Sequence, residues 1–175
     1  MSINKKVISA AVVVALSGVS MMTNAAPSAD VTLTGTITNT TCDVTVNGGQ
    51  ANLNVGAYKV ADITTAGVLA QVGSIPLPVV LTNCTTDETG NLVIQGNTSN
   101  LDASNQLFTS ATTDTVGFMI KDEAGNNISE GKSVPFSVTT AGPNIYSYNV
   151  GMASATNAPL AGAYRAPITV SYIVN

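Results

Sequence analysis

Apolar and polar residues alternate one for one near both ends of this chain, and this pattern constrains the fold more than any other feature. Residues 31–38 read VTLTGTIT, and residues 164–174 carry an apolar side chain at every second position. Successive side chains of a β-strand point to opposite faces, so a period of two predicts strands with one buried face. Several short predicted strands, with turn residues about every ten positions, predict an all-β sandwich in one domain.

The intervening segments give the expected order of elements. We expect strands at 42–46, 53–55, 75–81, 92–95, 116–121, 134–138 and 146–152, before the final alternating stretch. Residues 57–73 and 97–115 are expected to be mostly loop, and residues 87–90 a turn. Pro76 and Pro78 cannot donate to a ladder, so their side of the strand is expected to face outward or an edge.

The first 25 residues have the three-part pattern of a secretory signal peptide. Lys5 and Lys6 precede an almost wholly apolar stretch, and Thr23-Asn24-Ala25 offers a small-residue cleavage site. The apolar stretch is shorter than the roughly 20 residues of a membrane span. We therefore expect an exported protein that begins at Ala26.

Composition excludes several classes of function. The sequence has no histidine, which removes Ser-His-Asp and Cys-His catalysis, and its acidic residues are scattered through turns. Without residues 1–25 the chain has four basic and ten acidic residues, a formal net charge of −6. Proteins bind nucleic acids through basic patches, and this net negative charge argues against such a patch. Nucleic acids are therefore not expected partners. No enzymatic activity, metal or cofactor is expected.

Two cysteines, Cys42 and Cys84, remain after the signal peptide. In an exported protein such a pair predicts a disulfide, and with two cysteines there is only one connectivity. Closing this loop would remove roughly 4 kcal/mol of unfolded-chain entropy in the simple chain-entropy model.

Three segments resemble pilins of the chaperone–usher family, including type 1 fimbrial subunits. They are LTGTITNTTCDVTV at 33–46, IPLPVVLTNC at 75–84 and GAYRAPITVSYIVN at 162–175. The resemblance implies an immunoglobulin-like sandwich that lacks its last strand. It also implies a periplasmic chaperone that lends a strand, an outer-membrane usher, and replacement of the lent strand by the N-terminal extension of the next subunit. The expected location is a fimbria on the cell surface, where the polymer supports adhesion.

The resemblance also assigns residues. It implies a donor extension at 26–37 and a pilin domain at 38–175. The donor residues would be Ala29, Val31, Leu33, Gly35 and Ile37, with Gly35 as the small donor residue. Residues 162–175 would form the last strand, lining the groove and contacting the chaperone through Gly162, Tyr164, Ala166, Ile168, Val170, Tyr172, Val174 and the Asn175 carboxylate. The family usually has a penultimate aromatic residue, whereas this chain has Val174 there and Tyr172 two positions earlier.

A self-contained exported β-sandwich that binds a ligand is the alternative. A complete domain would bury residues 29–37 in its own sheet, whereas a pilin would hold them free for a neighbour. A tip adhesin is disfavoured, because about 150 mature residues leave little room for a second, receptor-binding domain.

The export hypothesis has a direct test. N-terminal sequencing or intact-mass measurement of exported protein is expected to show Ala26 as the first residue. Exported protein that retains residues 1–25 would contradict the assignment.

Overall fold

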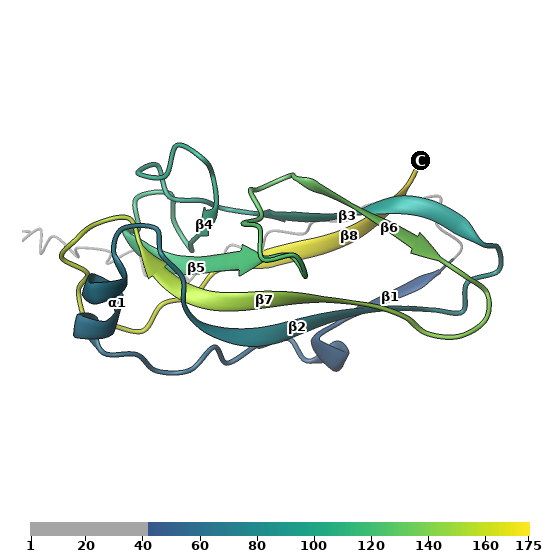
Figure 1. Ribbon diagram of the computed structural model, residues 1–175, viewed down its shortest axis with the longest axis horizontal. Helices are drawn as coiled ribbons and strands as arrows, with labels where there is room; N and C mark the ends of the chain where they lie inside the picture. Colours follow the sequence, from purple (N-terminus) through teal and green to yellow (C-terminus); the bar gives the residue numbers. More distant parts are fainter. Residues whose placement is uncertain (1–41) are drawn as a thin grey trace, which may run out of the picture. The chain divides into compact units, whose positions relative to one another are not determined.

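The structure is a computed structural model that describes residues 42–175, all within one compact unit. Two antiparallel sheets pack face to face (Figure 1). The five-stranded sheet has the order β1 (Asp43–Val46), β2 (Val72–Thr82), β7 (Asn144–Ser154), β5 (Val116–Lys121) and β4 (Leu107–Phe108). The three-stranded sheet has the order β6 (Ser133–Val138), β3 (Glu88–Gly96) and β8 (Ile168–Val174). The predicted all-β sandwich is confirmed.

The core lies between the two sheets and is built from alternate residues of the inner strands. Leu77, Val79 and Leu81 of β2 face it, as do Leu92 and Ile94 of β3. Four of these five side chains are fully buried and Leu77 is 4% exposed, as expected where a strand has neighbours on both flanks or a covering layer above it.

Pro76 and Pro78 occupy the outward-facing row of β2, as the sequence predicted. Pro76 is exposed and Pro78 is half-buried, whereas Leu77 between them is buried. β1 pairs with β2 only from Val79 to Thr82, so both prolines lie on a part of β2 whose single partner is β7. Neither proline therefore interrupts a two-sided ladder.

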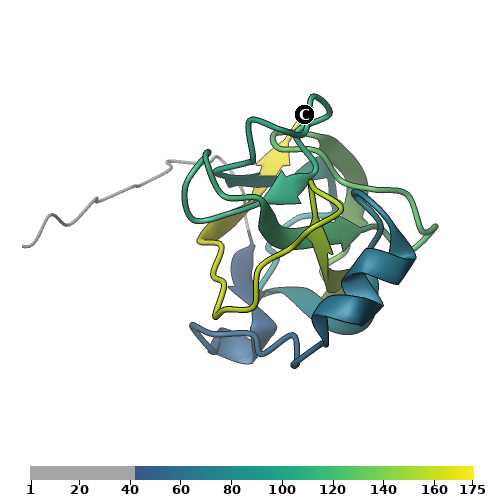
Figure 2. The same cartoon turned by 90° about the vertical axis from the view of Figure 1, so that its left-hand side faces the viewer.

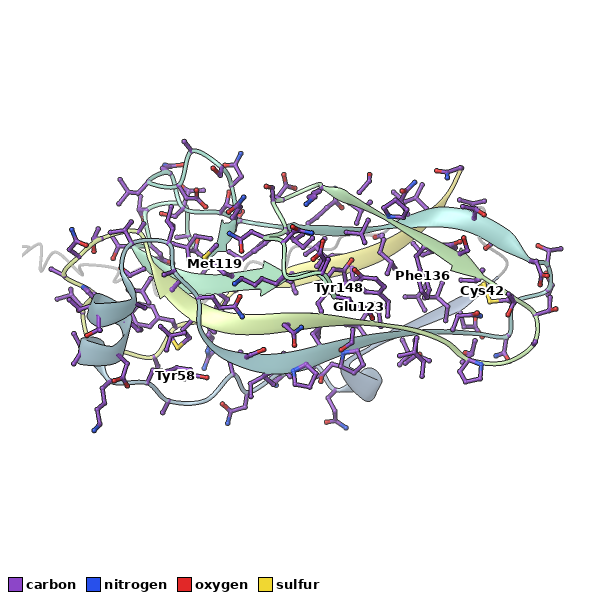
Figure 3. All side chains as sticks on the ribbon, viewed as in Figure 1. Cys42, Tyr58, Met119, Glu123, Phe136 and Tyr148 are labelled. Carbon is purple, nitrogen blue, oxygen red and sulfur yellow. A yellow bond between two sulfur atoms is a disulfide. The ribbon has the colours of Figure 1, made fainter. Side chains whose placement is uncertain are left out.

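The predicted disulfide is present between Cys42 and Cys84. It joins the residue before β1 to the turn after β2, next to the register pair Asp43–Thr82. The bond fixes the short strand β1, which has only four residues, to the much longer β2. We call this end of the sandwich, where Cys42 is labelled in Figure 3, the disulfide end.

One helix, α1 (Val60–Ala66), lies in the segment that was expected to be mostly loop. The Asp62 carboxylate accepts a hydrogen bond from the Lys59 backbone N–H at 3.2 Å, which stabilises the first turn. Ile63 is the buried side chain that holds the helix against the sheets. The helix has seven residues with one buried anchor, so it lacks the repeated apolar spacing that identifies a helix in a sequence. Among the described residues, no helix is long and apolar enough to span a membrane.

Three further expectations are wrong in their boundaries. Residues 53–55 form no strand, because they pair with no neighbouring strand. The expected turn at 87–90 lies earlier, since β3 begins at Glu88 and pairs with Val138 of β6 there. The last strand begins at Ile168 rather than Gly162, and Pro167, which has no amide hydrogen, directly precedes it.

Two buried tyrosines provide a matched test of the core. Tyr172 Oη lies 3.3 Å from the Phe136 carbonyl oxygen and 3.5 Å from that of Glu88. Tyr148 Oη is buried and has no hydrogen-bond partner among the residues that the structure describes. Burial is the main cause that raises the pKa of Tyr148, with Tyr146 a lesser one.

We expect Tyr172→Phe to lower the free energy of unfolding by about 1 kcal/mol, and Tyr148→Phe to leave it unchanged or raise it by a similar amount. Urea denaturation of the two variants measures both effects. Equal destabilisation by the two substitutions would show that the Tyr148 hydroxyl has a partner.

Candidate strand-binding groove

Among the strands of residues 42–175, four lie at sheet edges, and only one of these four offers a long unblocked edge. β4 has two residues and β1 has four, while β6 contains Pro135. β8 has seven residues, contains no proline, and pairs only with β3. A strand edge with free N–H and C=O groups is a template for pairing with another chain. The outer edge of β8 is therefore the candidate site for an added strand.

The apolar row of β1 shows that the core is incomplete next to this edge. Val44 pairs with Leu81 and Val46 pairs with Val79, so all four side chains face the space between the sheets. Leu81 and Val79 are fully buried, but Val44 is 36% exposed and Val46 is half-buried. The incomplete burial of these core-facing valines on β1 means that no element within residues 42–175 fully covers them.

β8, in the other sheet, also carries core-facing side chains that are incompletely buried. Ile94 of β3 is fully buried, whereas its register partner Val170 on β8 is only half-buried. Ile168 and Val174 face the same side and are also half-buried against the core. β1 and β8 are near neighbours, and an end-on view places both on the opposite side of the domain from α1 (Figure 2). The two exposed rows thus form the walls of one groove.

A cavity of about 530 Å³ lies at the α1 end of the sandwich. The chain leading into α1 forms one side of it and the chain leading into β8 forms another, with β5 and β7 beneath. Phe118 and Met152, a register pair on β5 and β7, remain only partly buried there. Figure 3 shows Tyr58 at this end and Cys42 at the other. Apolar lining residues of the cavity include Leu53, Val55, Tyr58, Phe118, Met152, Leu160 and Tyr164.

Tyr172 interrupts the exposed row of β8 because it is itself buried. Its ring packs edge-on against Phe136 with centroids 6.5 Å apart, and burial raises the pKa of its hydroxyl, with a smaller contribution from Glu88. The ring also lies over Gly90, where an added Cβ would come within 2.7 Å of it. Tyr172 therefore anchors β8 to the core and is not part of the open surface.

The remaining residues assigned from the resemblance divide into three groups. Gly162 and Tyr164 line the cavity, and Ala166, Ile168, Val170 and Val174 pack partly exposed against the core. Asn175 lies past β8, where Asn91 Nδ2 donates a hydrogen bond of 2.6 Å to its side-chain oxygen. The donor residues Ala29, Val31, Leu33, Gly35 and Ile37 lie outside the described residues.

The sequence analysis missed one wall of the groove and the floor of its cavity. Val44 and Val46 lie two and four positions after Cys42, so the alternation at 42–46 already places their side chains on the same, core-facing side of the strand. Phe118 and Met152 lie side by side because β5 pairs with β7 in one particular register. The local sequence around either residue does not predict that register. Within residues 42–175, no group of three or more His, Cys, Asp or Glu side chains is arranged to hold a metal ion.

Comparisons with known proteins agree with this geometry. The family model described as "Fimbrial protein" matches residues 31–175. The crystal structure of the P pilus rod subunit PapA superposes with a TM-score of 0.61 at 18% identity, covering 77% of this chain and 99% of that one. A chaperone–usher pilus structure, described in relation to rod uncoiling, gives 0.60 at 18% identity and covers 85% and 96%. A search of curated proteins found no match.

The register pair Val46 and Val79 tests whether the groove is open. Val79→Ala removes two buried methyl groups and is expected to lower the free energy of unfolding by about 2 kcal/mol. Val46→Ala is expected to cost half of that or less in the free domain, because the Val46 side chain is already in contact with water. Urea denaturation of the two variants decides this, and equal losses would mean that the groove is closed in solution.

Proposed function

Since this chain belongs to the fimbrial protein family and is a structural subunit of a surface fimbria, we propose that its groove is filled by a strand from another copy of the chain. The proposal rests on one observation. Val44 on β1 is exposed and Val46 on β1 and Val170 on β8 are only half-buried. Their register partners Leu81, Val79 and Ile94 are fully buried. An added strand between β1 and β8 would cover both rows and pair with the free edge of β8.

The N-terminal extension supplies a strand of suitable pattern. Residues 29–37 place Ala29, Val31, Leu33, Gly35 and Ile37 on one face, and these five are the proposed donor residues. Each aliphatic side chain buried in the groove would contribute roughly 1.5–3 kcal/mol, in addition to the main-chain hydrogen bonds along β8. Gly35 suits a place where the strand passes close to the groove floor.

The donor strand is proposed to run antiparallel to β8. Every strand pair in the described part of the chain is antiparallel, and antiparallel ladders are slightly more stable per residue than parallel ones. In this orientation Ile37 lies near the cavity at the α1 end, and Ala29 lies near the disulfide end.

The exposed groove implies a partner before assembly. An open apolar groove beside a free strand edge is an aggregation hazard, so a protein that lends a strand during export would protect the subunit. A periplasmic chaperone has this role in the proposal, and an outer-membrane usher is the place where the donor extension replaces it. The subunit is proposed to act structurally and to have no catalytic role.

A pair of aspartate substitutions tests the donor face. Leu33→Asp would place an unpaired charge in the apolar groove, which is costly, whereas Thr34→Asp puts the same charge on the outward face one residue later. We expect Leu33→Asp subunits to fold with the chaperone and form the disulfide but to give no fibres by electron microscopy. Thr34→Asp subunits should give normal fibres. Normal fibres from Leu33→Asp would refute the proposal.

A second variant tests the groove without polymerisation. A copy of residues 29–37 added after Asn175 through a short turn would fold back antiparallel to β8 and fill the chain's own groove. Analytical ultracentrifugation is expected to show a stable monomer. The matched control carries Leu33→Asp in the added copy and should still self-associate.

A further inference from the structure

We propose that the two ends of the domain are complementary docking surfaces, so that the α1 end of one copy binds the disulfide end of the next. This contact is additional to the donor strand, and the proposal rests on the proposed function. The α1 surface consists of Lys59, Val60, Leu160 and Arg165. The disulfide-end surface includes Asp43 and Asp87 and the loop at 139–143, which connects β6 to β7.

The α1 surface exposes apolar side chains next to the mouth of the cavity. Leu160 is 75% exposed and Val60 is 41% exposed, and both line the cavity. Arg165 directly follows Tyr164, another lining residue. Apolar side chains gathered at the rim of a binding groove, and not scattered over a surface, indicate a contact with another molecule.

The charges at the two ends are of opposite sign. Lys59 and Arg165, two of the four basic residues after residue 25, are both exposed at the α1 end. Asp62 is also in α1, and its carboxylate accepts the Lys59 backbone N–H. At the other end Asp43 and Asp87 are exposed, and each accepts one hydrogen bond, from Asn83 and from the Thr140 N–H respectively.

The length of the connecting chain brings these two surfaces together. Only residues 38–41 separate Ile37, the last donor residue, from Cys42 at the disulfide end. A chain of this length spans at most about 17 Å from Ile37 to Cys42 even when fully extended. Once Ile37 occupies the cavity region of one copy, the disulfide end of the donating copy must lie close to that cavity.

The charges also agree with the antiparallel orientation of the donor strand. An antiparallel donor brings Asp43 and Asp87 of the donating copy toward Lys59 and Arg165 of the accepting copy. A parallel donor would instead bring two disulfide ends together and oppose acidic residues to acidic residues, which is unfavourable. Head-to-tail contacts of this kind are heterologous, and they generate filaments when the rotation between copies does not close a ring.

A cysteine pair tests the contact in assembled fibres. Leu160→Cys and Ala141→Cys place one exposed thiol at each end, and mild oxidation of fibres carrying both is expected to link neighbouring subunits. After heating in detergent without reductant, electrophoresis should show a ladder of covalent oligomers. Each single variant, and the pair Leu160→Cys with Asn100→Cys in the loop before β4, should give no ladder. If fibres form but neither this pair nor Val60→Cys with Ala141→Cys gives a ladder, the docking proposal is wrong.

Charge reversal tests the electrostatic match separately. Lys59→Glu with Arg165→Glu is expected to slow self-association of the purified protein about tenfold or more at low salt, as followed by light scattering. Lys121→Glu with Lys132→Glu makes the same change in net charge elsewhere and should have a much smaller effect. Equal rates would overturn the charge match. If Leu33→Asp abolishes fibres and the cysteine pair gives no ladder, the donor-strand proposal is supported and the docking proposal is wrong. If Leu33→Asp subunits form fibres, the donor-strand proposal itself is wrong.

Discussion

A strand side chain that faces a core is buried only if the strands around it are present, and the described part of this domain lacks one of them. The five-stranded sheet presents a wider apolar face than the three-stranded sheet can cover. The shortfall lies along β1 and β8, where Val44, Val46 and Val170 remain in contact with water. The groove is thus the uncovered part of an otherwise ordinary sandwich core, and its binding chemistry is the same burial that holds the rest of the fold together.

The walls of an unfilled groove need support from elsewhere in the domain. β1 pairs with β2 through four residues, and the Cys42–Cys84 disulfide ties its first end to the same strand. β8 is held by its ladder to β3 and by the buried ring of Tyr172, which contacts Phe136 and donates to backbone carbonyls. Both walls are therefore anchored on the side away from the opening, so an incoming strand meets preorganised edges and less ordering entropy is lost on binding.

The sequence predicted the architecture well because its signals are local. Short strand-like segments bounded by turn residues located β5 at 116–121 without error and found β1, β2, β6 and β7 to within a few residues, and the cysteine pair could connect in only one way. The predictions that failed depended on pairing across the sheets. Residues 53–55 have strand composition but no ladder partner, and α1 is stabilised by Asp62 and Ile63 rather than by a periodic face.

The groove could be inferred from the sequence only in part. Alternation placed Ile168, Val170 and Val174 on one face of the last strand, yet the same pattern would describe a strand in a complete sheet. The difference between Val46 and Val79, identical residues paired across one ladder, is visible only as a difference in exposure. Phe118 and Met152 belong to the cavity through a register that no sequence window contains.

The distribution of prolines and short strands along the sheet edges sets how many neighbours a subunit can accept. Pro135 interrupts β6, Pro76 and Pro78 lie on the part of β2 that β1 leaves uncovered, and β4 is too short to hold a partner. Such features discourage pairing at those edges. In the proposed assembly, one acceptor edge on β8 and one donor segment give each subunit a valence of two, one link of each kind. Growth at such units is linear, and a branch point would require a second acceptor edge that these prolines remove.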